Sequence, residues 1–166
     1  KAGSFLKLSK IFSNSQITEF NYRLSDPNDA HVLVGVKTKS AKNFISLKNK
    51  LSKNHYSFKD LTKNEISNDH LRHMVGGRSP TARTERVFRM EFPERPGALL
   101  DFLEKLGNKW NITLFHYRNL GSAFGKVLVG IEDTSKNKEL LKRYLKRTGY
   151  TFTEETSNIA YKHFLE

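Results

Sequence analysis

The spacing of apolar side chains is clearest in the second half of the chain, where it predicts a full set of elements. Residues 87–92 alternate between apolar and polar side chains, as a strand with one buried face does. Leu99, Phe102 and Leu106 then recur at helical spacing, and Gly107 is suited to end that helix. We expect further strands at 111–118, 126–132 and 150–152, and helices at 136–148 and 157–165.

The first half of the chain repeats the second half at a nearly constant offset. Residues 17–23 (Ile-Thr-Glu-Phe-Asn-Tyr-Arg) recur at 112–118 (Ile-Thr-Leu-Phe-His-Tyr-Arg), and Val-Leu-Val-Gly recurs 95 positions later in the following strand. Residues 56–58 (Tyr-Ser-Phe) match 150–152 (Tyr-Thr-Phe), which predicts a strand there too. Several blocks in the same order indicate two copies of one structural unit.

The predicted elements of each copy follow the order β-α-β-β-α-β. This order is that of a split βαβ unit, so we expect an α+β fold of two such subdomains, with antiparallel sheets and helices on one face. The first copy begins at its first helix, near Gly3, and upstream residues or another chain are expected to supply its central first strand. We place subdomain 1 at 1–76, a linker of turn residues at 77–84, and subdomain 2 at 85–166.

The third strand of each copy is continuously apolar over 32–34 and 127–129. Such strands are typically covered on both faces. Because helices are expected on one face only, the other face is expected to meet a partner domain or subunit. Gly35 and Gly130, inside these strands, indicate tight packing or the close approach of another group.

The net charge of +12 raises the possibility of a nucleic-acid partner. However, the charge is spread over the chain: residues 1–77 carry 13 basic and 6 acidic side chains, and residues 78–166 carry 16 and 11. This distribution favours a solvated, lysine-rich surface. The absence of cysteine excludes disulfides and thiolate metal sites and favours a reducing compartment such as the cytoplasm. No apolar run is long enough to span a membrane.

The Phe-x-Tyr-Arg motif of the second strands is the sharpest candidate for ligand chemistry. It has two interpretations: core aromatics beside surface arginines, or hydroxyl and guanidinium groups that frame a small polar ligand, since arginine binds carboxylates through two hydrogen bonds. By alternation, Arg23 and Arg118 point to one face and the other residues to the opposite face: Thr18, Phe20 and Tyr22 in one copy, and Thr113, Phe115 and Tyr117 in the other.

A second candidate is the turn at residues 93–98, which joins a strand to the start of a helix. Free amides near Gly97 and Ala98 favour an anion at such a position. His70 and His73 lack further ligands at metal-binding spacing, and the sequence has no P-loop, dinucleotide fingerprint or catalytic-triad pattern. We therefore expect a binding module with no catalytic, metal-ligating or cofactor-binding residues of its own.

Several motifs together closely resemble the C-terminal regulatory domain of biosynthetic threonine deaminase, also called threonine dehydratase or threonine ammonia-lyase. The resemblance covers essentially the whole chain, and the run from Trp110 to Arg118 is specific. The motifs are Gly3-Ser4-Phe5-Leu6-Lys7, Thr18-Glu19-Phe20-Asn21-Tyr22-Arg23, Met74-Val75-Gly76-Gly77-Arg78, Phe92-Pro93-Glu94-Arg95-Pro96-Gly97-Ala98-Leu99 and Trp110-Asn111-Ile112-Thr113-Leu114-Phe115-His116-Tyr117-Arg118.

This resemblance implies two ferredoxin-like ACT-type subdomains in a tetrameric enzyme that depends on pyridoxal phosphate (PLP). Such an enzyme converts L-threonine into 2-oxobutanoate and ammonia on the route to isoleucine. Isoleucine inhibits it through this domain and valine opposes the inhibition. The catalytic domain, which holds the PLP, lies upstream and is absent from this sequence.

The resemblance also implies where an effector binds, because ACT domains commonly bind amino acids at the turn after the first strand. Some carry Asn-Arg-Pro-Gly there, where this chain has Glu94-Arg95-Pro96-Gly97. We expect amides near Gly97 and Ala98, helped by Arg118, to take the effector's carboxylate, and Glu94 or strand-edge carbonyls to take its ammonium. Leu99 with Phe115 or Phe20 is expected to form the apolar pocket, and Tyr22-Arg23 and Tyr117-Arg118 to shape two sites.

Two other function classes follow from the same pattern. An RNA-recognition module has the same β-α-β-β-α-β order, but it stacks bases on aromatic side chains of its third strand, and residues 127–131 contain none. That absence counts heavily against RNA binding. A pure oligomerisation domain with degenerate ligand sites stays open.

Overall fold

The computed structural model describes residues 3–24, 30–69, 84–119, 121, 123–135 and 137–165. The predicted linker, apart from Thr84, and His70 and His73 lie outside these residues. The first copy contributes α1 (Ser4–Ile11), β1 (Gln16–Arg23), β2 (Val32–Lys37), α2 (Ala41–Lys53) and α3 (Glu65–Asp69). The second contributes β3 (Glu85–Pro93), α4 (Ala98–Leu106), β4 (Asn111–Arg118), β5 (Phe124–Glu132), α5 (Lys138–Thr148), β6 (Phe152–Glu154) and α6 (Ile159–Phe164).

All elements predicted for the second copy are present, with ends that differ from the predicted ones by at most two residues. Residues at the ends of the helices explain where α4 and α5 begin or end. Gly107 ends α4 and Gly149 ends α5, both with positive φ, where glycine has no steric penalty. Asn137 begins α5 by accepting a hydrogen bond from the Glu139 amide through its side chain.

The strands form one antiparallel sheet in the order β2-β1-β4-β5-β3-β6. Within it, β4-β5-β3-β6 has the order of a ferredoxin-like unit, whose first strand, β3, is central. The predicted α+β, ACT-type fold is thus confirmed. The two copies nevertheless share one sheet, because β1 pairs directly with β4.

The pairing of β1 with β4 relates the two copies by a local two-fold axis. Phe20 is paired with Tyr117, and Tyr22 with Phe115. Since Phe20 corresponds to Phe115 and Tyr22 to Tyr117 in the repeat, the axis passes through the Asn21–His116 pair between them. Each contact across this axis therefore has an equivalent contact on the other side of the axis.

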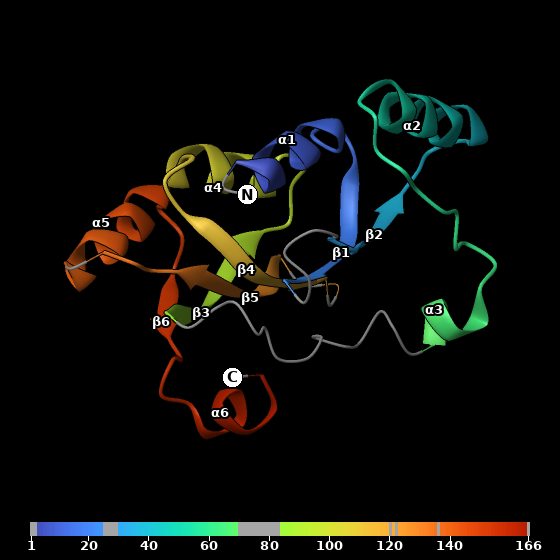
Figure 1. Cartoon of the computed structure of the whole chain (residues 1–166). Coiled ribbons are helices and arrows are strands. Elements are labelled where there is room, and N and C mark those ends of the chain that lie inside the picture. Colours follow the sequence, from blue (N-terminus) through green and yellow to red (C-terminus); the bar gives the residue numbers. More distant parts are fainter. Residues whose placement is uncertain are drawn as a thin grey trace.

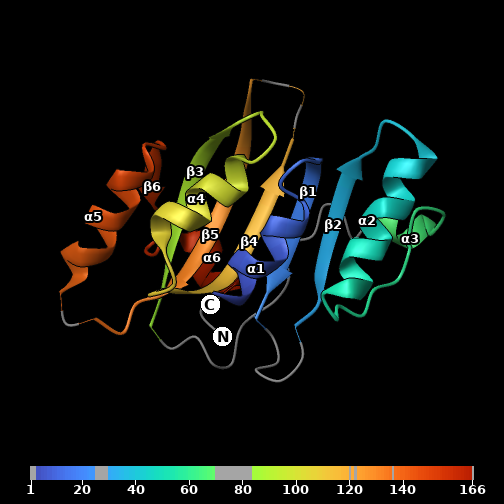
Figure 2. The same cartoon turned by 90° about the horizontal axis from the view of Figure 1, so that it is seen from above.

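Four helices lie side by side over one face of the sheet, in the order α5, α4, α1 and α2 (Figure 2). Between this layer and the sheet lies the main core, which includes Phe88, Phe92, Phe102 and Phe115. The short helix α6 lies on the opposite face (Figure 1), so the prediction of helices on one face only is wrong for this helix. Part of the face that we assigned to a partner is thus covered by the chain's own C-terminal helix.

A buried polar cluster fastens α6 to that face. The Glu85 carboxylate accepts hydrogen bonds from Arg23, Thr113 and Tyr161, which come from β1, β4 and α6. The side chains of Glu85 and Arg23 are 2% and 6% exposed, and Arg23 also donates to the Leu165 carbonyl at 2.6 Å. The cluster therefore joins both copies and the C-terminal helix.

Two β-bulges correct the predicted strand faces. The register between β4 and β5 shifts at Ile112/Leu114, and the register between β1 and β2 shifts at Ile17/Glu19. The extra residue turns Thr113 away from the face of Phe115 and toward Glu85, so our alternation was wrong for this threonine. Gly130 lies beside this bulge, where a Cβ would be 2.6 Å from the Glu85 carboxylate. This glycine thus marks a close approach, as one of our two interpretations proposed.

The first copy differs from the second at the free side of β2. Residues 56–58 form no strand, so that prediction was wrong. The physical reason is that β6, their counterpart, pairs with β3, and no strand in the described part of the first copy corresponds to β3. Val32 and Val34 are consequently half-buried, whereas Val127 and Val129 are 2% and 0% exposed. A cleft of about 850 Å³ lies beside β2, α2 and residues 56–62.

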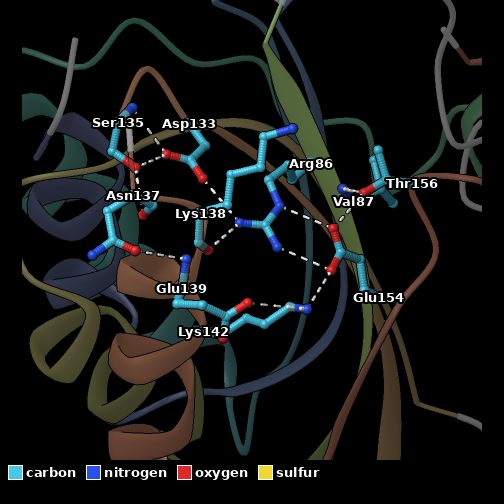
Figure 3. A network of polar contacts seen from close by, with 10 residues as sticks. All are labelled: Arg86, Val87, Asp133, Ser135, Asn137, Lys138, Glu139, Lys142, Glu154 and Thr156. Carbon is cyan, nitrogen blue, oxygen red and sulfur yellow. Dashed lines mark hydrogen bonds and ion pairs between the residues drawn. The ribbon is translucent and has the colours of Figure 1, made fainter.

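A second polar network stabilises the edge of the second copy (Figure 3). The Arg86 guanidinium donates two hydrogen bonds to Glu154, both at 2.9 Å, and one each to Asp133 and the Lys138 carbonyl. This paired geometry is among the stronger kinds of ion pair. It ties β3, β6 and the start of α5 together.

This network predicts a specific dependence of stability on acid. Hydrogen bonds from Arg86, together with Lys142, lower the pKa of Glu154 from 4.5 to about 2 despite its partial burial. Because the folded pKa lies below the unfolded one, the carboxylate stabilises the fold fully above pH 4.5, and this contribution is lost as the pH falls toward 2. We expect Glu154→Gln to reduce the difference in the free energy of unfolding between pH 7 and pH 2 by on the order of 2 kcal/mol.

Urea unfolding at pH 7, 4.5, 3 and 2 measures that effect. The matched control is Glu139→Gln, on the neighbouring helix, whose side chain is 72% exposed and lies 3.9 Å from the same lysine. Equal pH slopes for Glu154→Gln and the unchanged protein would contradict the assignment.

Candidate effector site between the two copies

A small closed pocket lies where the end of α1 meets the turn between β3 and α4. Its walls combine the first copy, from Ser9 to Ile17, with the second, from Phe92 to Leu100 and at Phe115 and Tyr117. The local two-fold axis explains this arrangement, because it sets the helix end of one copy against the strand–helix turn of the other.

The polar end of the pocket is a carboxylate held from two sides. The Tyr117 hydroxyl donates to Glu94 Oε1 at 2.6 Å, and the Asn119 amide donates to Glu94 Oε2 at 2.5 Å. Burial and the neighbouring carboxylate raise the pKa of Tyr117 well above its ordinary value, so its hydroxyl remains a donor. A carboxylate has about four acceptor positions, so Glu94 retains capacity for a further donor such as an ammonium.

A second polar feature of the pocket is the start of α4. Gly97 is its N-cap, with φ of 83°, and no side chain caps the first turn. Amides at an uncapped helix start, together with the helix dipole, favour an anion. A Cβ on Gly97 would lie 3.7 Å from the Ser13 carbonyl, an ordinary contact, so glycine is favoured here by its positive φ and not by lack of space.

Apolar side chains close the rest of the pocket. Phe12 and Ile17 come from the first copy, and Leu99 and Phe115 from the second. The remaining cavity is only about 30 Å³, which is the space of about one water molecule. An amino acid therefore enters only if the walls of the pocket move apart.

The structure brings six of the ten predicted effector residues together at this pocket: Glu94, Gly97, Ala98, Leu99, Phe115 and Tyr117. Phe20 is fully buried in the core, where its ring contacts Phe5 and Phe115. Arg23 lies on the opposite face with Glu85. Arg118 follows Tyr117 in an extended strand, which directs it to that opposite face as well.

Tyr22 lines the two-fold counterpart of this pocket, within the larger cleft. Gly3, Ser4 and Phe5 of the first copy meet Leu106 and Ile112 of the second there. Burial raises the pKa of Tyr22 above its ordinary value, although the neighbouring Arg23 charge opposes this. The molecule thus has one narrow and one wide version of the same junction.

Sequence reasoning missed the residues that the first copy gives to the closed pocket, from Ser9 to Ile17, and it missed Asn119. A repeat within a sequence shows that two units exist and does not show which surfaces of the units meet. Only the antiparallel pairing of β1 with β4 reveals that contact. The sole signal for Asn119 was a difference between the copies, since Leu24 is in the matching position.

The fold and this junction define a tandem ACT-type module with a small pocket between its copies. Among the residues described, no helix is long and apolar enough to cross a membrane, and no group of three His, Asp or Glu residues is arranged to hold a metal ion.

Comparison with known proteins identifies the family. The model of the C-terminal regulatory domain of threonine dehydratase matches residues 1–71 and 76–165. The L-threonine dehydratase biosynthetic IlvA of Burkholderia multivorans is 42% identical over 98% of this chain, and that of Escherichia coli is 41% identical over 98%. The mitochondrial threonine dehydratase of Saccharomyces cerevisiae is 37% identical over 99%.

The chain therefore belongs to the family of threonine dehydratase C-terminal regulatory domains, as its motifs indicated. It spans about a third of the length of these relatives, 32% of both bacterial proteins and 30% of the yeast protein.

Proposed function

We propose that this chain is the allosteric sensor of a PLP-dependent L-threonine ammonia-lyase and that it binds isoleucine as inhibitor and valine as opposing effector. The observation that carries the proposal is the pair of charge-complementary groups that line one apolar pocket. The Glu94 carboxylate suits an ammonium, the uncapped start of α4 suits a carboxylate, and Leu99 and Phe115 suit a branched aliphatic side chain.

The position of the pocket supports a regulatory role. One wall belongs to the first copy and the other to the second, so a ligand that enters must shift α1 relative to the β3–α4 turn. A ligand that binds only the open arrangement shifts the population toward it by its difference in affinity. Isoleucine and valine then act oppositely by favouring different arrangements of the same two copies.

Membership of the family is the basis for what we propose about the rest of the enzyme. PLP and the catalytic residues belong to the upstream part of the full protein, and this chain is proposed to carry out no catalysis itself. We propose a cytoplasmic homotetramer for that full protein, with the regulatory module in contact with the catalytic domain.

We expect isoleucine and valine to compete for the same site on the chain. Their affinities should differ by about 10–200-fold, because that is the discrimination that one methylene in an apolar pocket provides. Threonine is expected to bind more weakly than both, since its hydroxyl would be buried without a designed partner. Calorimetric titration with the three amino acids, alone and in competition, measures this.

Tyr117→Leu should weaken isoleucine binding, and in the full-length enzyme it should weaken inhibition by isoleucine, because Glu94 loses a donor and the pocket loses a wall. Tyr144→Leu is the matched control: this tyrosine is half-buried on α5 and packs on Trp110, away from the pocket. The proposal fails if isoleucine and valine produce no heat and no shift in thermal stability.

RNA binding is not favoured by any feature of the structure. An RNA-recognition module presents the helix-free face of its sheet to the bases, and here α6 lies on that face. An oligomerisation domain without ligand remains the outcome that a negative titration would support.

A further inference from the structure

Two residues outside the turn control how Glu94 is presented. Asn119, directly after β4, holds Glu94 Oε2, while Tyr117 holds Oε1. The Glu94 amide also donates to the Ala123 carbonyl at 3.0 Å, which binds the turn to the β4–β5 connection. The carboxylate is thereby fixed at the mouth of the pocket.

Gly125 makes that arrangement sterically possible. A Cβ on this residue would lie 2.3 Å from Cε2 of Tyr117 and 2.8 Å from Oε1 of Glu94. Real side chains do not approach so closely. The backbone of Gly125 has no positive φ, so alanine is compatible with its conformation and only the space is lacking.

The first copy provides a natural comparison at both positions. Its equivalents, 95 residues earlier, are Leu24 for Asn119 and Ala30 for Gly125. For Leu24 and Asn119 the equivalence is structural as well, since the Leu24 amide donates to the Thr113 carbonyl and the Asn119 amide to the Thr18 carbonyl across the two-fold axis. Leucine cannot hold a carboxylate, and Ala30 carries the methyl group that Gly125 lacks.

We infer that Asn119 and Gly125 are positioning residues for the ammonium of an α-amino-acid ligand and that they confine ammonium recognition to the Tyr117 side of the module. The inference rests on the proposed function. The residues act through Glu94: Asn119 orients its carboxylate, and Gly125 leaves room for the Glu94–Tyr117 pair. The Tyr22 side has neither residue and does not provide this recognition.

The test compares two ligands that differ only in the ammonium: isoleucine and 3-methylpentanoate. Both are titrated by calorimetry and by NMR against the unchanged chain, Asn119→Leu and Gly125→Ala. Each substitution is expected to weaken isoleucine binding at least about tenfold, the value of one charge-assisted hydrogen bond. Binding of 3-methylpentanoate, weak in all proteins, is expected to stay within about twofold of the unchanged chain. Such a split is not produced by general loosening of the fold.

The matched controls are Leu24→Asn and Ala30→Gly in the first copy, which should leave isoleucine affinity unchanged. Equal loss for both ligands would assign the two residues a purely structural role and overturn the inference. The inference would also be overturned if the unchanged chain binds isoleucine and both Asn119→Leu and Gly125→Ala bind it with the same affinity. No isoleucine binding to the unchanged chain would instead overturn the proposed function and, with it, the inference.

Discussion

Replacement of Glu85 by leucine is expected to destabilise the protein by about 3–5 kcal/mol, the cost of removing one partner from a buried ion pair. The Glu85 side chain is 2% exposed and is the shared acceptor of Arg23, Thr113 and Tyr161. Without it, a buried guanidinium and two buried hydroxyls lose their common partner. Because the free energy of unfolding of a domain is only about 5–15 kcal/mol in total, this single change is expected to remove a large share of it.

The loss should appear first at the C-terminal helix. Tyr161 is 6% exposed and bonds Glu85 at 2.7 Å, and Arg23 holds the Leu165 carbonyl. We expect the amides of α6 to exchange with solvent much faster in Glu85→Leu than in the unchanged protein. Urea unfolding gives the free energy, and hydrogen exchange followed by mass spectrometry locates the opening.

The matched control for this change is Glu91→Leu on the same strand. That glutamate pairs with Lys126, but its side chain is 39% exposed, and exposed pairs contribute about 1 kcal/mol or less. If Glu85→Leu costs no more than Glu91→Leu, the buried cluster does not stabilise the fold as we infer.

The elements of the second copy could be predicted because their signals are local. The alternation of apolar and polar residues predicted β3, the helical spacing of apolar residues predicted α4, and Gly107 predicted where α4 ends. The cluster around Glu85 had no such signal. A bulge adds one residue to a strand and reverses which face its neighbour occupies, so Thr113 reached Glu85 although simple alternation placed it with Phe115.

The candidate site was half predictable for a related reason. The turn at Glu94–Leu99 combines residue types that suit a charged ligand, and those types are visible in the sequence. The wall formed by Phe12 and Ile17 depends on the two-fold contact between copies, which no pattern along one chain encodes. The short polar connection after β4 likewise gave no reason to single out Asn119 before its contact with Glu94 was seen.

No strand among the described residues pairs with the outer edge of β2, and this edge leads to the second large expected effect. We propose that the polypeptide upstream of Lys1 in the full-length protein supplies a strand there, which pairs with β2 and lets residues 56–58 form the outer strand. The second copy shows the finished arrangement, with β3 between β5 and β6. In the first copy Val32 and Val34 are half-buried, and Phe58 is 39% exposed.

A chain extended by about ten upstream residues is therefore expected to be more stable by on the order of 3 kcal/mol, since burial of each large apolar side chain contributes about 1.5–3 kcal/mol. Its β2 and 56–58 amides should gain protection from hydrogen exchange. The control extension has the same length, with its apolar residues replaced by serine. The chain without extension is expected to self-associate through the exposed edge. Sedimentation that shows a monomer at all concentrations, together with equal stability of both extended chains, would show that this edge needs no strand.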